Sequence, residues 1–290
     1  MGETMKVSPS YRKYVIHNIY AIITYNTIAL WPILYYTMGL RLNVFETIIF
    51  TFGLVFAQFL FQTSVFTTEI KKISLVGYRS KLIYNDEEIP LIFANLDSHS
   101  FVSINKKIPN QIIVLSSNDI LLSIFHELGH YFHKDPVKTV IIMMATTIIT
   151  TITTYIFHKP IHALILYVLL SFVVLYLKHR SEIRADKFML NFIDCESYRK
   201  FIENVTGVPY EFIETPKTKK ELLKHKIISI LLGHLTYEYR FRMYEECKRN
   251  ELNSLNGDNE YYYGNQNEKP LSNKYYNDIS IEFNNSETLN

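Results

Sequence analysis

The sequence is poor in cysteine and in charged residues. Its two cysteines, Cys195 and Cys247, are too few for a disulfide framework, so they fit a reducing compartment or two inert thiols. Glycine-rich phosphate loops and the dinucleotide-binding fingerprint are absent, which argues against nucleotide-dependent enzymes. No arginine-rich cluster is present, so a nucleic-acid partner is not expected. Charged residues make up only 20% of the chain, below the usual quarter or so.

The sequence contains four long apolar runs. Residues 15–38, 139–157 and 161–177 contain no Asp, Glu, Lys or Arg, and residues 44–66 contain one acid. About 20 residues cross a bilayer, so each run is long enough or nearly so. The sequence therefore predicts an integral membrane protein with four transmembrane helices in two hairpins. The alternative is that the two shorter runs are buried core helices.

Basic residues predict how these helices are oriented. Lysines and arginines precede the first and third runs and follow the second and fourth, whereas the two short connectors offer only Arg41 and Lys159. The positive-inside rule then places both termini and all substantial soluble mass on the cytosolic side.

Domain organisation follows from this topology. We expect an N-terminal hairpin in residues 1–66 and a second hairpin in residues 137–177. The soluble pieces 67–136 and 178–249 are each too short for an adequate core, since a single core is marginal below about 70–80 residues. We expect them to form one domain together. Residues 250–290 contain 11 asparagines, seven acids and two lysines, which predicts a disordered polar tail.

The two soluble pieces differ in predicted secondary structure. Short β-rich stretches occur at residues 91–94, 101–104 and 111–115 of the first piece. The second piece has a helical pattern, with residues 222–247 as its longest predicted helix. The fold class is therefore mainly α, with an α+β soluble domain.

A metal-binding pattern lies at the end of the first soluble piece. Residues 117–119 can cap an apolar helix over residues 120–132. His126 and His130 lie four residues apart on it, so both imidazoles can reach one metal ion. Glu127 follows the first histidine and can approach a metal-activated water. The alternative is a helix with two incidental histidines, but an apolar helix normally excludes such residues unless they are paired.

A third ligand is needed, because catalytic zinc keeps three protein ligands. The best candidate is Glu182, which shares a helical face with Asp186 four residues later. One carboxylate can bind the metal while the other accepts a proton from a ligand imidazole. The alternative is an amphipathic helix with solvated charges, and His179 is a reserve ligand. Gly129, costly inside a helix by about 1 kcal/mol, leaves space beside the site.

These motifs resemble a known family. The segment His126-Glu127-Leu128-Gly129-His130, with Asp135 five residues on and Glu182-Ile183-Arg184-Ala185-Asp186 after a membrane hairpin, is similar to the HtpX and type I CAAX prenyl endopeptidase family. That family consists of membrane-embedded zinc metalloproteases of the gluzincin kind, and the hairpin arrangement looks closer to HtpX. The resemblance implies a zincin-like catalytic domain in a bacterial plasma membrane, with one zinc held by His126, His130 and Glu182 and with Glu127 as catalytic base.

Two further matches extend the resemblance. His234 and Arg240 stand six residues apart, as in the family's His-Pro…Arg motif, although Leu235 replaces the proline. This implies that His234 is catalytic and that Arg240, like Asp135 and Asp186, supports the ligands from behind. The segment 100–102 resembles the edge strand before the catalytic helix, which implies that Phe101 and Val102 bind substrate.

The sequence thus predicts a membrane-bound zinc endopeptidase. Its expected substrates are membrane-associated or unfolded proteins or peptides, cleaved by metal-activated water. Apart from the bilayer and the substrate, no partner is predicted. The alternative is a metallopeptidase-like membrane sensor or scaffold without general proteolytic activity; a missing Glu127 or Glu182 would have favoured it, and both are present.

Overall fold

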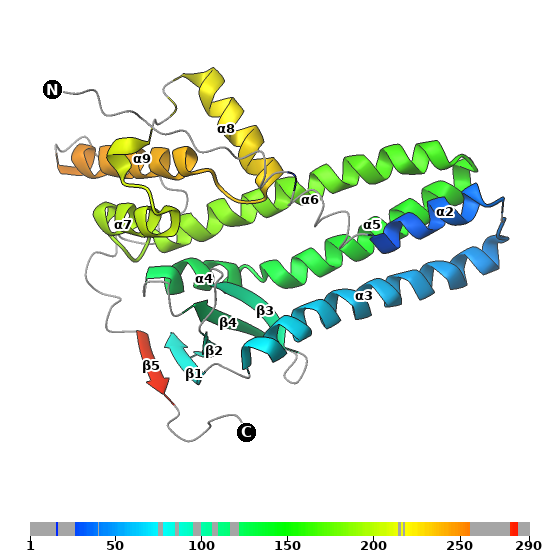
Figure 1. The fold of residues 1–290 in the computed structure, drawn as a ribbon, viewed down its shortest axis with the longest axis horizontal. Helices are drawn as coiled ribbons and strands as arrows, with labels where there is room; N and C mark the ends of the chain where they lie inside the picture. Colours follow the sequence, from blue (N-terminus) through cyan, green and yellow to red (C-terminus); the bar gives the residue numbers. More distant parts are fainter. Residues whose placement is uncertain are drawn as a thin grey trace.

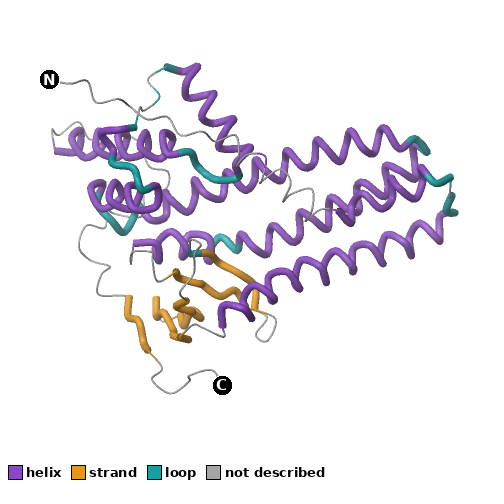
Figure 2. Tube along the Cα trace, in the orientation of Figure 1, coloured by secondary structure: helices purple, strands orange, loops and turns teal. Residues whose placement is uncertain are grey.

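The computed structural model shows a mainly helical protein with one small mixed sheet (Figures 1 and 2). Three long helices run side by side as an arm, and the sheet and the remaining helices gather at one end of it. The structure describes residues 16, 27–39, 41–74, 78–84, 87–94, 100–105, 110–116, 122–213, 216, 218–255 and 279–283.

The arm consists of α3 (Val44–Ser74), α5 (Asp135–Phe157) and α6 (Pro160–Met189). Each is long and apolar enough to cross a membrane, so the last three predicted runs are confirmed as candidate spans. Large apolar side chains are exposed along all three, as expected of a membrane protein. Of the first run, the structure describes little beyond η1 (Thr27–Leu30) and the short α2 (Trp31–Thr37), so a fourth crossing stays a prediction.

Threonines on α5 turn inward and bond back to their own helix. The hydroxyl of Thr150 donates to the carbonyl of Thr146 at 2.7 Å, and that of Thr154 donates to the carbonyl of Thr150 at 2.7 Å. Both side chains are buried, on a helix that packs between α3 and α6. Because each hydroxyl finds a partner within the helix, this polar stripe is tolerable in an apolar environment.

The sheet has the strand order β3-β4-β2-β1-β5. The predicted strands are confirmed as β2 (Glu87–Ala94), β3 (Phe101–Asn105) and β4 (Asn110–Ser116). β1 (Tyr78–Tyr84), which the sequence analysis did not predict, pairs antiparallel with β2. β2 and β4 are parallel, β3 returns antiparallel beside β4, and β3 thus forms one edge of the described sheet.

The other edge is formed by the C-terminal tail. β5 (Ile279–Phe283) pairs antiparallel with β1, and helix α9 (Tyr237–Leu255) continues into the tail's first residues. The prediction of a wholly disordered tail over residues 250–290 is therefore wrong for these two segments. The polar composition predicts disorder, but one short alternating segment is enough to add a strand to an open sheet edge. The rest of the tail lies outside the described residues.

Helices α4 (Leu122–Phe132), α7 (Cys195–Thr206) and α8 (Lys219–Leu232) complete the body together with the 3-10 turn η2 (Tyr210–Phe212). The predicted single helix over residues 222–247 is wrong, because Gly233 adopts φ +66° and separates α8 from α9. A helix cannot continue through that left-handed conformation, which glycine adopts without strain.

One core joins the two soluble pieces. Side chains of the sheet and α4 pack with side chains of α7 and α9 in a single buried cluster, which includes Leu91, Ile113, Leu128, Phe201 and Phe241. A disulfide between Cys195 and Cys247 also ties α7 to α9. The expectation of two separate thiols is therefore wrong: the residues lie far apart in sequence, and only the packing of α7 on α9 brings them together.

Candidate metal centre

Helix α4 carries two of the candidate ligands inside the protein. Nine of its eleven residues are buried, because it packs against the sheet on one side and against α6 on another. His126 and His130, one turn apart, are 7% and 9% exposed. A buried imidazole is costly unless its nitrogens find partners, so the surroundings of these two rings decide what they can bind.

The third candidate ligand arrives because α4 and α6 touch at Gly129. A Cβ atom placed on Gly129 would lie only 2.7 Å from the Cα atom of Ala185. No side chain fits between the two backbones at this point, and Ala185 itself is fully buried. The contact brings the polar end of α6, beyond its apolar run, against α4 and sets Glu182 opposite the histidines.

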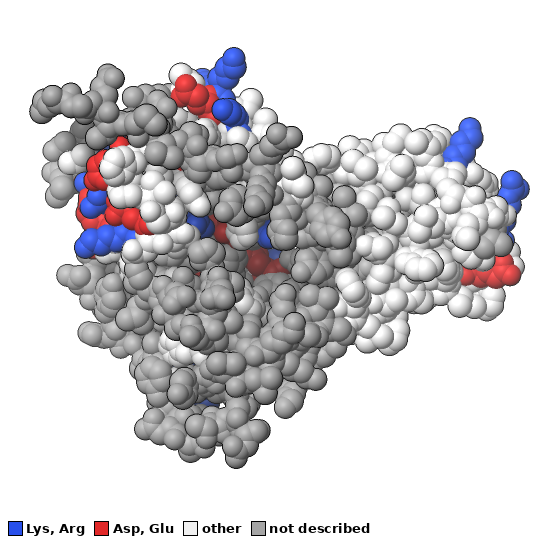
Figure 3. All heavy atoms as spheres, viewed as in Figure 1, with Lys and Arg blue, Asp and Glu red and all other residues white. Residues whose placement is uncertain are grey.

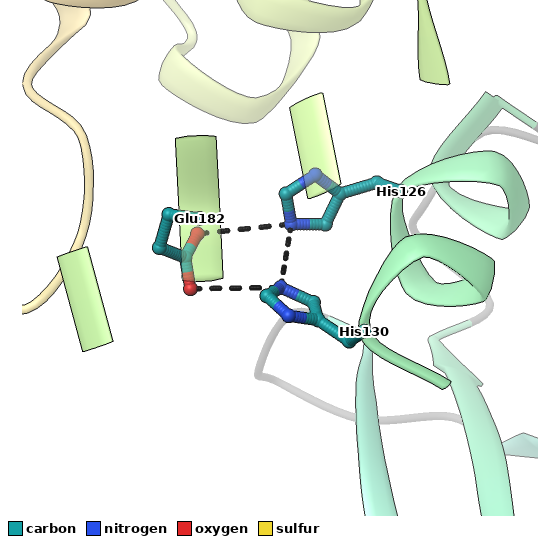
Figure 4. A group of neighbouring side chains, drawn as sticks. All are labelled: His126, His130 and Glu182. Atoms are coloured by element: carbon teal, nitrogen blue, oxygen red, sulfur yellow. Dashed lines mark hydrogen bonds and ion pairs between the residues drawn. The ribbon is translucent and has the colours of Figure 1, made fainter. Parts of the chain in front are cut away.

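The three side chains form a compact triangle (Figure 4). The Nε2 atoms of His126 and His130 are 3.2 Å apart. Glu182 Oε2 lies 3.7 Å from Nε2 of His126, and Oε1 lies 3.6 Å from Nε2 of His130. Tetrahedral ligands about 2.0–2.2 Å from zinc are about 3.3–3.6 Å from one another. Donor types and spacing therefore both fit a zinc ion.

Each histidine is also held from behind by a carboxylate. His130 Nδ1 donates to Oδ2 of Asp135 at 2.8 Å, and His126 Nδ1 lies 2.7 Å from Oδ1 of Asp186. A proton on each Nδ1 leaves each Nε2 lone pair directed into the triangle, as metal ligation requires. Asp135 is held in turn by Arg184, whose Nη2 donates to Oδ1 at 2.9 Å.

Burial would lower the pKa of His130, but the hydrogen bond to Asp135 and the charges of Glu182 and Glu127 raise it to about 9. Asp135 shows the reciprocal effect: burial would raise its pKa, and His130 and Arg184 lower it. A metal ion bound in the triangle would take the place of the proton on Nε2 of His130, because a ring nitrogen binds metal only through its unprotonated lone pair.

Glu182 is surrounded by three imidazoles and one guanidinium group. Besides the two ligand histidines, His234 Nδ1 lies 3.1 Å from its Oε1 and Arg240 Nη2 lies 3.5 Å from its Oε2. Burial would raise the pKa of Glu182, but His234, His130 and His126 together hold it well below its usual value. The residue is therefore ionised, as a metal ligand must be.

Asp186 is fully buried and is contacted from three sides. Its Oδ2 accepts hydrogen bonds from Arg240 Nε at 3.0 Å and from the Tyr198 hydroxyl at 2.9 Å, while Oδ1 faces His126. Burial would raise its pKa, but Arg240 and then His126 lower it. Arg240 thus touches both carboxylates of α6 and fixes their spacing.

Glu127 is 5% exposed and lies on α4 next to His126. Its negative charge contributes to raising the pKa of His130. His179, the reserve ligand, does not belong to the described metal-binding group. It is fully buried and packs edge-on against the ring of Tyr239.

The remaining predicted site residues occupy two places. His234, whose side chain is 61% exposed, follows Gly233 at the rim of the triangle. Phe101 and Val102 are half-buried on the edge strand β3, which packs against α4. Their backbone lies at the open side of the described sheet.

Two supporting residues were not predicted from sequence. Tyr198, which donates to Asp186, sits on α7 in a stretch with no recognisable motif. Arg184, which holds Asp135, stands between Glu182 and Asp186 and could have been found by asking which cation balances the charge of Asp135.

No protein-family model, curated protein or solved structure matches this chain. Its function is therefore inferred from the chemistry of these side chains.

The contact at Gly129 predicts a selective effect of one methyl group. Gly129→Ala should push α4 away from α6, destabilise the protein by about 1–3 kcal/mol and weaken zinc binding, because overpacking separates the ligands. Gly53→Ala is the matched control, since its Cβ meets nothing within 4 Å. Thermal unfolding and zinc titration of both variants check this. Equal behaviour of the two variants would show that the helices do not meet at Gly129.

Proposed function

We propose that the chain is a membrane-bound zinc-dependent endopeptidase, distantly related to the HtpX and CAAX prenyl endopeptidase family. The carrying observation is the buried triangle of His126, His130 and Glu182, in which both imidazoles are backed by carboxylates. A zinc ion bound there would supply Lewis acidity, which lowers the pKa of a water and polarises a peptide carbonyl.

The protein's own groups would handle the protons. Glu127, buried beside His126, is placed to take a proton from the attacking water on its carboxylate and to pass it to the leaving amine. Asp135 and Asp186 keep the Nδ1 protons of the two histidines in place during this exchange. Arg240 balances the negative charge that Glu182 and Asp186 bring into the core.

Extended substrates fit the edge of the sheet. β3 pairs only with β4 within the described residues, and it packs against the helix that carries Glu127. An added substrate strand would be held mainly by its backbone, which suits unfolded or membrane-extracted chains of varied sequence. Phe101 and Val102 would contact side chains of such a substrate.

Membrane orientation is a separate part of the proposal. The distribution of lysine and arginine favours a cytosolic body, whereas disulfides such as Cys195–Cys247 are mainly a feature of oxidising compartments. The two features make opposite predictions. Labelling of a cysteine introduced at Lys159, in the short α5–α6 connector, decides between them in intact cells.

The metal proposal predicts about one zinc per chain, with casein cleavage lost on chelation and restored by zinc. Glu182→Ala should weaken zinc binding by more than 10–100-fold, roughly what loss of a supporting residue alone costs. Glu211→Ala, which removes an exposed acid, is the control. Full zinc affinity in Glu182→Ala would move the third ligand elsewhere. Zinc without any cleavage would favour a sensor or scaffold.

We expect His234 to contact the substrate and to contribute little to the stability of the fold. Its ring is largely exposed at the rim of the triangle and lies next to Glu182. It can therefore donate a hydrogen bond to the oxyanion that would form when water attacks the peptide carbonyl. His234→Phe should keep zinc and thermal stability but lower kcat by about 10²–10³ with little change in KM. His162→Phe, at the far end of α6, should change neither value. An unchanged kcat in His234→Phe would leave the oxyanion without this donor.

A further inference from the structure

Helix α8 has an exposed face in which lysines flank apolar side chains. Its six most exposed side chains of these two kinds are Lys219, Lys220, Leu223, Lys224, Lys226 and Ile227. Leu223 and Ile227 are 57% and 49% exposed. The one acid of the helix, Glu221, is engaged in a capping box with Thr218 at its start.

The arrangement around the helix axis is ordered. At about 100° per residue, Leu223 and Ile227 fall in the middle of the exposed arc. Lys219 and Lys226 border that arc on one side, and Lys220 and Lys224 border it on the other. No ion pair is found for these four lysines among the described residues. Lysines on both sides of exposed apolar side chains suit contact with a membrane interface, because their stems lie along apolar surface while their ammonium groups stay among the headgroups.

The opposite face of α8 is anchored to the body. His225 Nδ1 lies 3.5 Å from Oε2 of Glu238 on α9, and the hydroxyl of Ser229 accepts a hydrogen bond from the backbone N–H of Thr236 at 3.0 Å. Ser229 and Leu232 are buried there. The exposed arc is thus fixed in direction and cannot turn inward to cover its apolar side chains.

The position of α8 along the arm matches the membrane boundary. α8 packs against α6, and the charge of Lys226 acts on His179, two residues beyond the apolar run that ends at Leu177. Figure 1 shows α8 running obliquely to the arm, with one end where α6 enters the body and the other end directed away from the arm. In Figure 3 basic side chains lie over its outer end beside an acidic one, and the face of the arm seen there shows charge only at its tip.

We propose that α8 is an interfacial helix that docks on anionic lipid headgroups of the bilayer crossed by the arm. The four lysines meet the lipid phosphates, and Leu223 and Ile227 enter the boundary between headgroups and acyl chains. Charge complementarity selects this occupant: the lysines stand on both sides of the apolar stripe, so a flat negative surface contacts both rows at once.

Docking would also bear on the candidate metal centre. α8 ends at Leu232, and two residues later His234 contacts Glu182. The Ser229–Thr236 hydrogen bond ties this connection back to the helix. A bilayer that holds α8 therefore holds His234 in place. This consequence rests on the proposed peptidase function, whereas the lipid contact itself does not.

The test uses the full chain in lipid nanodiscs. An environment-sensitive fluorophore is attached to Leu223→Cys, with Leu252→Cys as control, because Leu252 is an equally exposed leucine on α9. In discs containing phosphatidylglycerol, the Leu223 probe should shift to shorter wavelength, and the shift should shrink in pure phosphatidylcholine or at high salt. The Leu252 probe should stay aqueous in every case.

A second variant separates charge from fold. Replacing Lys219, Lys220, Lys224 and Lys226 with glutamine keeps good helix formers but should abolish the response to phosphatidylglycerol, with zinc content and thermal stability unchanged. An aqueous Leu223 probe in all discs would overturn the proposal, as would a shift that ignores lipid charge or survives the glutamine changes. A shift that needs an added acidic protein would assign the face to a protein partner instead. Zinc and casein assays on the same samples report the peptidase proposal separately.

Discussion

Glu127→Gln should leave zinc binding intact and reduce peptide cleavage by about 10²–10⁴-fold. The amide keeps the size and burial of the side chain but cannot accept a proton, and general-base assistance typically contributes this much to a rate. None of the three ligand atoms of the triangle belongs to Glu127, so the metal site should stay whole. Zinc content and casein cleavage, measured on the same purified sample, check both parts.

The control for Glu127→Gln is Glu203→Gln, the same chemical change at a half-buried glutamate of α7 that pairs with Arg199. Its cleavage rate should match that of the unchanged protein. Cleavage by Glu127→Gln at the rate of the unchanged protein would contradict the proposed peptidase mechanism. Loss of zinc together with activity would instead show that Glu127 supports the metal site.

Arg240→Ala should destabilise the protein by about 3–5 kcal/mol. Arg240 is buried and donates to Asp186 and Glu182, and its removal leaves two buried carboxylates without their main counter-charge. Because Asp186 contacts Nδ1 of His126 and Glu182 is a proposed ligand, zinc affinity should fall as well. Thermal unfolding with and without added zinc measures the two effects.

Arg242→Ala, two residues along the same helix, is the matched control for Arg240→Ala. Arg242 is half-buried, pairs with Glu246 at 3.1 Å and donates to the carbonyl of Pro216 at 2.9 Å. Its removal leaves no buried charge without a partner, so it should cost only about 1–2 kcal/mol. Similar unfolding temperatures for the two alanine variants would contradict the central position given to Arg240.

The sequence located the triangle because its parts are local. His126 and His130 share a helical face by spacing alone, and Glu182 and Asp186 share another. Helix geometry fixes such pairs whatever the rest of the fold does. The step from two pairs to one site rested on the number of ligands that zinc needs and on the family resemblance, because local helix geometry does not predict that α4 and α6 are in contact. In the structure, that contact depends on Gly129 and Ala185.

Features that depend on distant chain segments were missed. The pairing of β5 with β1 joins residues about 200 positions apart, and the short alternating segment in the asparagine-rich tail does not indicate which sheet edge it joins. The disulfide arises only once α7 lies on α9. The sequence pattern predicts Gly233 to be part of a continuous helix. Its left-handed backbone conformation instead begins the turn that brings His234 next to Glu182.

The separation of the ligands by the α5–α6 hairpin has a consequence for biosynthesis. His126 and His130 are translated first, then the hairpin, and only afterwards Glu182. The triangle forms where α4 meets the end of α6, so its third corner is absent until both apolar helices have been made and paired. We therefore expect a nascent or uninserted chain to lack the complete ligand set, so that the proposed proteolytic activity would begin only after the apolar helices have inserted into a membrane.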